Sequence, residues 1–340
     1  MRERALVVDR HRGEAVRRAL VDAGALRPDL EILEEGGRLA LPLRAGASVE
    51  PGWGTVEERE FPPRSVAARG EFADALAWPS ERKALLPRAF DVVGEIVLVR
   101  LPEALEPFRF EVGEALLGFV PGCRLVGLDR GVQGPERKRS VERIAGGGPW
   151  STRHRENRLE LDVDVEHAYF SPRLAGEHAR LAARVERGER VYDLCCGVGP
   201  FAVTIARDGR AAAVTAVDLN GEAIALLRAT LARYAFATPV RPVEASVEAF
   251  APTAPPVERV IVNLPREGIK YAALVAPLVV PGGRLHFYDV VSRDEVDRRR
   301  AVVEEQLTPH GRWAVADVRR VHPYSPSHDL IAIEAERRGT

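Results

Sequence analysis

Two acids and a pair of glycines in the second half of the chain have the spacing of a nucleotide-like binding site. In DLCCGVGPF (193–201), Asp193 lies at the end of an apolar run, and Gly197 and Gly199 follow at the turn into a helical segment. Glycines at such a turn let backbone amides approach a ligand closely and leave the helix N-terminus open to it.

The second acid follows the next apolar run. Seventeen residues past Phe201, AAVTAVD ends in Asp218, which precedes Leu219 and Asn220. An acid at the end of the second strand is placed to accept hydrogen bonds from two ribose hydroxyls. The glycine motif lacks the third glycine of the dinucleotide fingerprint, so the two signals together favour S-adenosylmethionine over NAD. Either acid alone is explained as well by a helix cap.

A third polar strand end is in IVNLPREG (261–268), where an apolar run meets Asn263, Leu264 and Pro265. A simple turn would account for the tripeptide, because Asn accepts turn geometry and Pro cannot continue a central strand. Asn263 also ends the fourth expected strand of this region, next to the switch point where open sheets bind ligands. Its amide is therefore a candidate to hold a base, with Pro265 stiffening the turn that presents it.

The elements that must position these residues alternate in type. From Leu159 on, apolar strand segments alternate with helical ones, which predicts a parallel sheet covered on both faces. RWAVADVRRV and DLIAIEA are joined only by HPYSPSH (322–328), so this last pair is expected to be antiparallel. We interpret HPYSPSH as a structural turn, because its two His have no further clustered ligand for a metal.

The first half of the chain predicts smaller units. Residues 4–45 have the pattern of a strand, a helix ended by Gly24 and a hairpin turning at Gly36-Gly37, whereas 46–80 is rich in Pro, Gly and Glu and is expected to be a linker. In the next unit, 90–100 is expected to be one strand, followed by a helix and a second strand. We expect domains at 1–45, 81–158 and 159–340.

Composition narrows the function classes. The 340 residues carry a net charge of −1, but between Arg124 and Arg158 nine Arg or Lys face four Asp or Glu. A local basic stretch of this kind favours binding of nucleic acid phosphates. We expect a cytoplasmic protein with no membrane span and no metal, since no apolar run approaches a bilayer span and the three cysteines lack a zinc spacing.

Five ordered segments resemble the archaeal and eukaryotic tRNA (guanine-N1)-methyltransferases that modify position 37 beside the anticodon: YFSPRLAGEHAR, DLCCGVGPF, VDLN, NLP and LHFYD. LPRAFDVVGEIVLVRLPEAL and VQGPERKRSVERIAG are similar to the middle domain of that family, and residues 1–45 to the small N-terminal domain of its archaeal members. The resemblance covers most of the chain except 46–80.

The resemblance implies an α/β fold. A small N-terminal α+β domain for tRNA recognition and a middle α+β RNA-binding domain would precede a Rossmann-like class I methyltransferase domain with a seven-stranded, mostly parallel sheet. It also implies S-adenosylmethionine as the methyl donor and tRNA as the partner, bound at the anticodon stem-loop and the outer corner. We expect a monomer.

The resemblance also implies roles for individual residues. Arg137, Glu177 and Asn263 match the residues that act on the guanine. Arg137 and Arg139 remain alternatives in a crowded basic loop. Cys195 replaces the usual aromatic residue beside the methionine portion, and Ser246 replaces an acid expected at the adenine, so that Glu244 or a backbone amide would make that contact. The expected cofactor set is Asp193, Cys195, Gly197, Gly199, Asp218, Leu219, Asn220, Ser246, Asn263 and His178, and the expected substrate set is Arg137, Arg139, Tyr169, Phe170, Arg173 and Pro265.

The chemistry of guanine N1 explains these residue types. This nitrogen carries a proton, so methylation needs a base and a cation that stabilises charge shifting to O6. We expect Glu177 to be the base and Arg137 the cation, although Glu177 could instead be a surface helix residue paired with Arg173 or Arg180. Tyr169 and Phe170 could form a wall for the flipped base, with core packing as the alternative for Phe170.

Rival functions remain open at this level. A relative that transfers the aminocarboxypropyl group of the same cofactor in wyosine synthesis is the nearest one, and methylation of a wyosine precursor is a possible second activity. NLP at 263–265 favours methyl transfer. A non-catalytic RNA-binding module would be expected to lack the cofactor glycines, and a small-molecule methyltransferase would leave the basic stretch unexplained.

Overall fold

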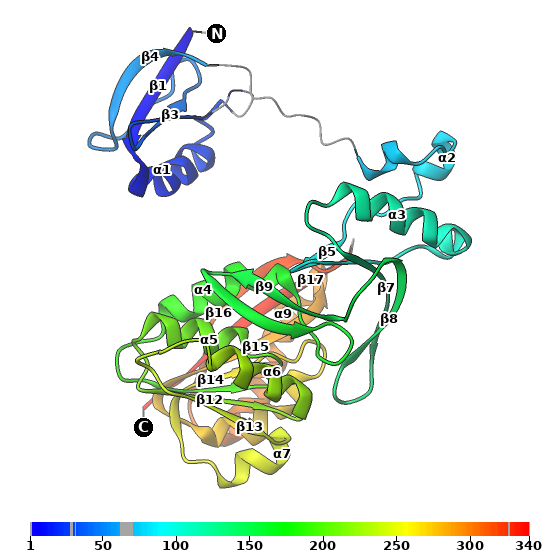
Figure 1. Ribbon diagram of the computed structural model, residues 1–340. Helices are drawn as coiled ribbons and strands as arrows, with labels where there is room; N and C mark the ends of the chain where they lie inside the picture. The colour runs from blue at the N-terminus through cyan, green and yellow to red at the C-terminus, as the bar shows by residue number, and fades with distance from the viewer. Residues whose placement is uncertain (1, 28–29, 31, 62–70, 326, 340) are drawn as a thin grey trace. The chain divides into compact units, whose positions relative to one another are not determined.

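The computed structural model describes residues 2–27, 30, 32–61, 71–325 and 327–339. The chain divides into two compact units, Met1–Ala77 and Trp78–Thr340. Figure 1 shows the elements of each unit.

The first unit is a four-stranded antiparallel sheet with one helix. Strand β1 (Arg2–Asp9) lies between β3 (Arg38–Pro42) and β4 (Thr55–Glu60), and β2 (Leu33–Glu35) pairs with β3 in the expected hairpin. Helix α1 (Arg10–Asp22) buries Val16 and Leu20 against Leu6 and Leu41 of the sheet. The core of this unit is therefore the apolar face shared by α1 and β1.

Strand β4 lies inside the segment that the sequence predicts to be a linker. It pairs with β1 over six residues, with Val56 opposite Leu6. The segment TVEERE carries four charges in six residues and only partly buried or exposed side chains. An edge strand of this kind buries too little apolar surface to show the usual alternation, which explains why composition alone indicated a linker.

The second unit begins with a four-stranded sheet in the order β5-β6-β7-β8. The segment 90–100, expected to be one strand, is two: β5 (Asp91–Val93) and β6 (Ile96–Val99) form a hairpin that turns at Gly94, which has a φ of 55°. Helix α3 (Arg109–Phe119) links β6 to the parallel strand β7 (Leu125–Gln133). Short helices α2 (Ser80–Lys83) and η2 (Glu103–Phe108) precede α3.

Much of the basic stretch 124–158 is ordered as strands. Strand β7 pairs with β8 (Lys138–Gly146), and β9 (Ser151–Glu156) pairs with β10 (Leu159–Asp164). The tip of the β7–β8 hairpin carries Arg137, which has a left-handed φ of 54°. The sequence predicts a basic loop here because charged residues hide the strand pattern of β8, whose side chains are mostly half-buried.

The remainder is a seven-stranded sheet in the order β13-β12-β11-β14-β15-β17-β16. Neighbours are parallel from β13 to β15, and β17 runs antiparallel to both β15 and β16. This confirms the predicted class I methyltransferase sheet and its antiparallel final pair. The strands are β11 (Arg190–Leu194), β12 (Ala213–Asp218), β13 (Val240–Glu244), β14 (Val257–Val262), β15 (Val279–Ser292), β16 (Trp313–Pro323) and β17 (His328–Arg337).

Helices cover both faces of this sheet (Figure 1). One core layer contains Leu181, Phe201 and Leu227 from three successive helices, and the other contains Val275 and Val303. Burying both faces keeps the parallel strands continuously apolar and leaves their carboxyl ends as the polar edge. The helices are α4 (Ala175–Arg184), α5 (Pro200–Asp208), α6 (Gly221–Leu231), α7 (Val247–Phe250), α8 (Ala272–Val275) and α9 (Val296–Leu307). No helix among the described residues is long and apolar enough to cross a membrane.

Candidate active site

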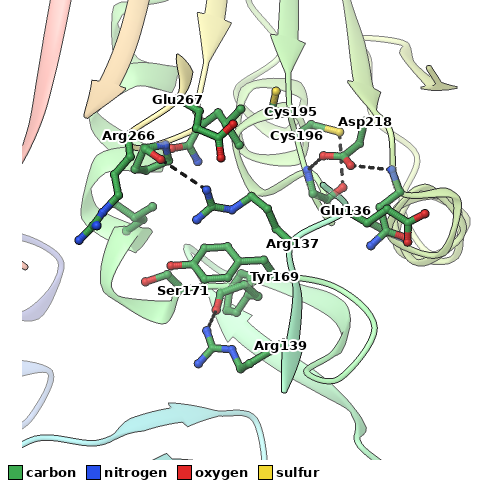
Figure 2. Close-up of a pocket in the computed structure, with 18 of the residues that line it drawn as sticks. Glu136, Arg137, Arg139, Tyr169, Ser171, Cys195, Cys196, Asp218, Arg266 and Glu267 are labelled. Atoms are coloured by element: carbon green, nitrogen blue, oxygen red, sulfur yellow. Dashed lines mark hydrogen bonds between the residues drawn. The ribbon is translucent and has the colours of Figure 1, made fainter. Parts of the chain in front are cut away.

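A cavity of about 570 Å³ lies in the second unit, lined by the ends of β11, β12 and β14 and by the β7–β8 hairpin. It brings together residues that are far apart in sequence, from Ala89 to Leu330. Figure 2 shows Arg137 between the Asp218 side and the Arg266 side of this cavity. The carboxyl edge of the sheet is where open α/β folds bind ligands.

The turn after β11 is built for close approach of a ligand. Gly197 and Gly199 have φ values of 56° and 75°, and Cys195 also adopts a left-handed φ of 58°. A Cβ on Gly199 would lie 2.5 Å from Leu227 Cδ1, so no side chain fits there. Cys195 and Gly197 line the cavity, whereas Gly199 only shapes the turn and starts α5.

Asp218 holds this turn and also lines the cavity. Its Oδ2 accepts from the Gly197 amide at 2.7 Å, and its Oδ1 accepts from the Asn220 amide at 2.9 Å. Burial raises the pKa of Asp218, and the two amide bonds partly offset that effect. Since these amides also fix both oxygens, the carboxylate is presented in one orientation to the cavity.

Asn220 and Ser246 have capping roles as well as lining the cavity. The Asn220 side chain accepts from two amides at the start of α6, and Ser246 accepts from the Ala249 amide at the start of α7. Leu219, which precedes Asn220 and is 44% exposed, also lines the cavity. Glu244 is not among the lining residues, so Ser246 is the one of the two alternatives that faces the cavity.

Asp193 is placed behind the turn and does not line the cavity. It is fully buried, and its Oδ2 accepts from the Ala202 amide at 3.1 Å. Burial raises the pKa of this carboxyl to about 8. Its Oδ1 has no hydrogen-bond partner among the residues that the structure describes.

Asn263 follows the last residue of β14 and lines the same cavity. Its amide donates to the Leu194 carbonyl at 3.3 Å, which ties the NLP loop to the strand that carries the glycine turn. Its side-chain Oδ1 is buried and lacks a partner within the described part of the chain. An orphaned polar atom of this kind in a cavity is suited to a ligand donor.

The two candidate arginines differ in what they bind. Arg139 is buried, and its guanidinium donates to Asp129 Oδ2 and to the Phe170 carbonyl, both at 3.0 Å. Arg137 forms no ion pair with any described residue; its Nη1 donates to the Pro265 carbonyl at 3.4 Å, and its guanidinium lies 5.2 Å from the Tyr169 ring centre. Arg137 therefore has free donors in the cavity, and Arg139 holds the wall (Figure 2).

Glu177 is held in an ion-pair network and is not among the lining residues. Its carboxylate accepts from Arg180 at 2.8 and 3.0 Å, from the Tyr288 hydroxyl at 2.6 Å and from Arg319. Burial alone would raise the pKa of Glu177, but the hydrogen bonds from Arg180 and Tyr288 and the charges of Arg180 and Arg319 outweigh it, so the pKa is lowered. The carboxylate is ionised at neutral pH.

The remaining predicted substrate residues surround the cavity. Tyr169, Phe170, Arg173 and Pro265 all line it. Phe170 is also buried in the core and packs 4.9 Å from the His154 ring, while Arg173 Nε donates to Asp91 at 2.7 Å. Phe170 therefore belongs to the core, as one alternative expected, and also lines the cavity.

His178 also lines the cavity, although it is almost fully buried. Its Nδ1 lies 2.7 Å from Glu156 Oε1, and its ring packs against Phe201. Its Nε2 has no partner among the described residues.

Sequence reasoning missed several cavity residues. Arg266 and Tyr324 line the cavity, and Arg100 binds Asp129 there. Tyr324 lies in HPYSPSH, whose prolines indicated only a turn. The sequence alone does not bring Tyr324 to the cavity; this follows only once β17 is paired with β15 and β16 with β17.

The residues present fit an S-adenosylmethionine site. The glycine turn admits backbone approach, Asp218 is placed for ribose hydroxyls, and Asn263 offers a free buried acceptor. Among the described residues, no group of three or more His, Cys, Asp or Glu could hold a metal ion.

Sheet order and site together define a class I methyltransferase. The family model described as the TRM5/TYW2 methyltransferase domain matches residues 152–311, the TYW2 N-terminal domain matches 73–149, and the tRNA methyltransferase 5 N-terminal domain matches 5–49. The chain belongs to the TRM5/TYW2 methyltransferase family.

Relatives cover nearly the whole chain. The tRNA (guanine(37)-N(1))-methyltransferase Trm5b of Pyrococcus abyssi is 32% identical in sequence, over 84% of this chain and 83% of its own. The crystal structure of Trm5b from Pyrococcus abyssi has a TM-score of 0.70 at 29% identity and covers 99% of this chain and 100% of that one. The complex of aTrm5 with tRNALeu has a TM-score of 0.69 at 27% identity, covering 98% and 99%. Methanocaldococcus jannaschii Trm5 in complex with adenosine gives 0.67 at 25% identity, covering 99% and 100%.

Proposed function

We propose that this chain is a tRNA (guanine37-N1)-methyltransferase with S-adenosylmethionine as its methyl donor. The observation that carries this proposal is the single cavity in which the glycine turn and Asp218 face Asn263 and Arg137. The relatives that match over most of the chain bear the name of this activity. The resemblance seen in the ordered sequence motifs is thus supported by both comparison and geometry.

The cofactor would be held by the polar edge of β11, β12 and β14. We assign Asp218 to the ribose, the backbone of Cys195–Gly197 to the methionine portion, and Leu219, Asn220 and Ser246 to the adenosine side. Asp193, which lies behind the turn, and Gly199 act by shaping it. When bound, S-adenosylmethionine supplies an electrophilic methyl group.

Arg137 and Asn263 are placed to act on the guanine. Negative charge moves to O6 as N1 loses its proton, and the guanidinium of Arg137, which forms no ion pair with any described residue, would stabilise it. The free Oδ1 of Asn263 can accept from an amino or ring N–H of the base and orient it. Tyr169, over which Arg137 lies, and Pro265 would form the walls of the base site.

Glu177 is the proposed acceptor of the N1 proton. Its lowered pKa keeps it ionised, but Arg180, Arg319 and Tyr288 occupy its oxygens. The role therefore requires that the carboxylate exchanges at least one of these partners for the guanine N–H when RNA binds. Glu177→Gln should reduce single-turnover methylation by 10²-fold or more, the usual range for a general base. Arg184→Gln serves as a control on the same helix, because Arg184 pairs with Glu334 and does not line the cavity. Full single-turnover activity of Glu177→Gln would exclude the role.

The rest of the chain would bind the RNA. N1 is hidden by pairing and stacking, so the target nucleotide must leave its stack. The basic residues of 124–158 would bind backbone phosphates of the anticodon stem-loop. Residues 1–45 would contact the outer corner of the same tRNA, and the protein would act as a monomer. Affinity should fall steeply with salt. We propose domains at 1–45, 81–158 and 159–340 on this basis. Strand β4 at 55–60 pairs with β1 and is added to the first domain.

One observation favours a second candidate reaction. Residues 73–149 match the TYW2 N-terminal domain, so aminocarboxypropyl transfer or methylation of a wyosine precursor is the alternative. A single experiment separates these reactions. The protein is incubated with tRNA transcripts bearing guanosine or another base at position 37 and with S-adenosylmethionine labelled separately in the methyl and aminocarboxypropyl groups. Methyl label in 1-methylguanosine supports the proposal, and label from the aminocarboxypropyl group would overturn it.

A further inference from the structure

The HPYSPSH segment contributes more than a turn to the molecule. Its residues His322 and Tyr324 line the same cavity as Asn263. Two backbone bonds tie Tyr324 to the start of β17, since the amides of Tyr324 and Ser325 both donate to the His328 carbonyl at 2.9 and 3.0 Å. Tyr324 remains 41% exposed. A large, partly exposed aromatic ring thus lines the cavity.

Arg266 lies on that ring. Its guanidinium carbon is 5.4 Å from the Tyr324 ring centre, and its backbone has a left-handed φ of 74°. The strained backbone is fixed by Asp289, whose Oδ1 accepts from the Arg266 amide at 2.7 Å. Arg266 forms no ion pair with any residue in the described part of the chain, unlike its neighbours Glu267 and Lys270, which pair with each other. The NLP loop therefore holds an uncompensated cation over an exposed ring.

This pair is separate from the cofactor side of the cavity. Figure 2 shows Asp218 and Arg266 on opposite sides, with Arg137 between them. Arg137 binds the Pro265 carbonyl, so the proposed base site lies directly next to Arg266 in the loop. Arg100, which lines the cavity and donates to Asp129 at 2.9 Å, adds a second cation to it.

We propose that Tyr324 and Arg266 receive the nucleotide adjoining the target guanosine in the RNA, a role that rests on the proposed function. In the free protein the Arg266 guanidinium covers the ring. On binding, the base of the neighbouring nucleotide stacks on Tyr324 and the guanidinium turns to its phosphate. Aromatic rings and unpaired arginines are the groups that hold single-stranded nucleotides in this way. The flanking nucleotide is thereby held beside the target as the target leaves the stack.

A binding cycle between protein and RNA tests this inference. Affinities are measured for full-length tRNA and for tRNAs that are abasic at the nucleotide on the 5′ or 3′ side of the target. The proteins are the wild type, Tyr324→Phe, Tyr324→Ala and Phe110→Ala. Phe110 is a matched control, because it is 51% exposed under the Arg109 guanidinium but does not line the cavity.

Loss of one stacked base should weaken binding roughly five- to 150-fold. On intact tRNA, we expect Tyr324→Ala to bind more weakly than the wild type by this factor. On one of the two abasic tRNAs, Tyr324→Ala and the wild type should bind with nearly the same affinity. Tyr324→Phe should keep wild-type affinity. Equal losses from Tyr324→Ala on intact RNA and on both abasic RNAs, or no loss at all, would overturn the inference. The binding cycle reports on Tyr324 whether or not methyl transfer occurs, and product analysis of the wild type tests the methylation separately.

Discussion

Asp289 is expected to control turnover although it does not line the cavity. It is 2% exposed, accepts from the Arg266 and Val290 amides at 2.7 and 2.9 Å, and lies 3.0 Å from Arg299 Nε. Arg266 adopts a left-handed conformation, which costs a non-glycine residue about 1–2 kcal/mol. The hydrogen bond from the Arg266 amide to Asp289 therefore stabilises the left-handed conformation of Arg266, and with it the loop that carries Asn263.

The size of the effect follows from these contacts. A hydrogen bond to a charged acceptor contributes about 1.5–3 kcal/mol, so its loss in Asp289→Ala should reduce the population of the ordered NLP loop. Because about 1.4 kcal/mol corresponds to a factor of ten in population, turnover should fall roughly ten- to 100-fold. Loss of the ion pair should also lower the free energy of unfolding by about 2–3 kcal/mol, less than for a fully buried pair because the Arg299 side chain is 34% exposed.

Single-turnover methylation, cofactor binding and urea unfolding are measured on the same preparations. Asp289→Asn keeps an acceptor for the Arg266 amide and should retain most of the turnover. Glu189→Gln is the stability control, because Glu189 binds the fully buried Arg259 at 2.7 and 3.0 Å and does not line the cavity. If Asp289→Ala turns over at the wild-type rate, or if Glu189→Gln loses activity in proportion to its stability, the positioning argument is wrong.

Three further changes have defined outcomes. Gly199→Ala places a Cβ 2.5 Å from Leu227 at a φ of 75°, so cofactor affinity measured by calorimetry should drop at least tenfold while tRNA affinity is retained. Burial raises the pKa of Asp193 to about 8, whereas in the unfolded chain the carboxyl ionises near pH 4. The contribution of Asp193 to the free energy of unfolding should therefore decline as pH rises from about 4 to about 8, and Asp193→Asn should lack this decline. Burial and the Arg259 charge lower the pKa of His286 well below 6.5. The contribution of His286 to the free energy of unfolding should therefore be complete above pH 6.5 and decrease below it. Urea unfolding of His286→Gln at several pH values should show a smaller decrease.

The methyltransferase sheet could be predicted because its strands are buried on both faces. Short runs rich in apolar residues, such as RVYDL and VERVIV, alternate with helical segments and so predict a parallel sheet. The chain order of the polar strand ends then places Asp218 and Asn263 at one edge. Strand β4 and the β5–β6 hairpin were not predicted correctly. β4 buries little apolar surface, and Gly94 lies within one continuous apolar segment.

The site was predictable only to the level of strand ends. Sequence could not separate Arg137 from Arg139, because the difference depends on the β7–β8 hairpin: Arg139 points to buried Asp129, whereas Arg137 sits at the tip in a left-handed conformation. Of the partners of Glu177, Arg180 lies three residues away and was named as an alternative from the sequence. Tyr288 and Arg319 lie more than 100 residues away, and no local pattern reports such contacts.

The β7–β8 hairpin makes the base site depend on two regions of the second unit. The acceptor Asn263 and the carbonyl of Pro265 belong to the sheet, whereas the cation Arg137 comes from the hairpin tip and reaches that carbonyl at 3.4 Å. The glycine turn and Asp218, by contrast, belong entirely to the sheet. Under the proposed roles, cofactor binding would need only groups at the sheet edge, whereas charge stabilisation at guanine O6 would also need the hairpin in place. RNA contacts that order the hairpin would couple binding of the substrate to assembly of the site, so that a guanine outside the bound RNA would lack the cation that its methylation requires.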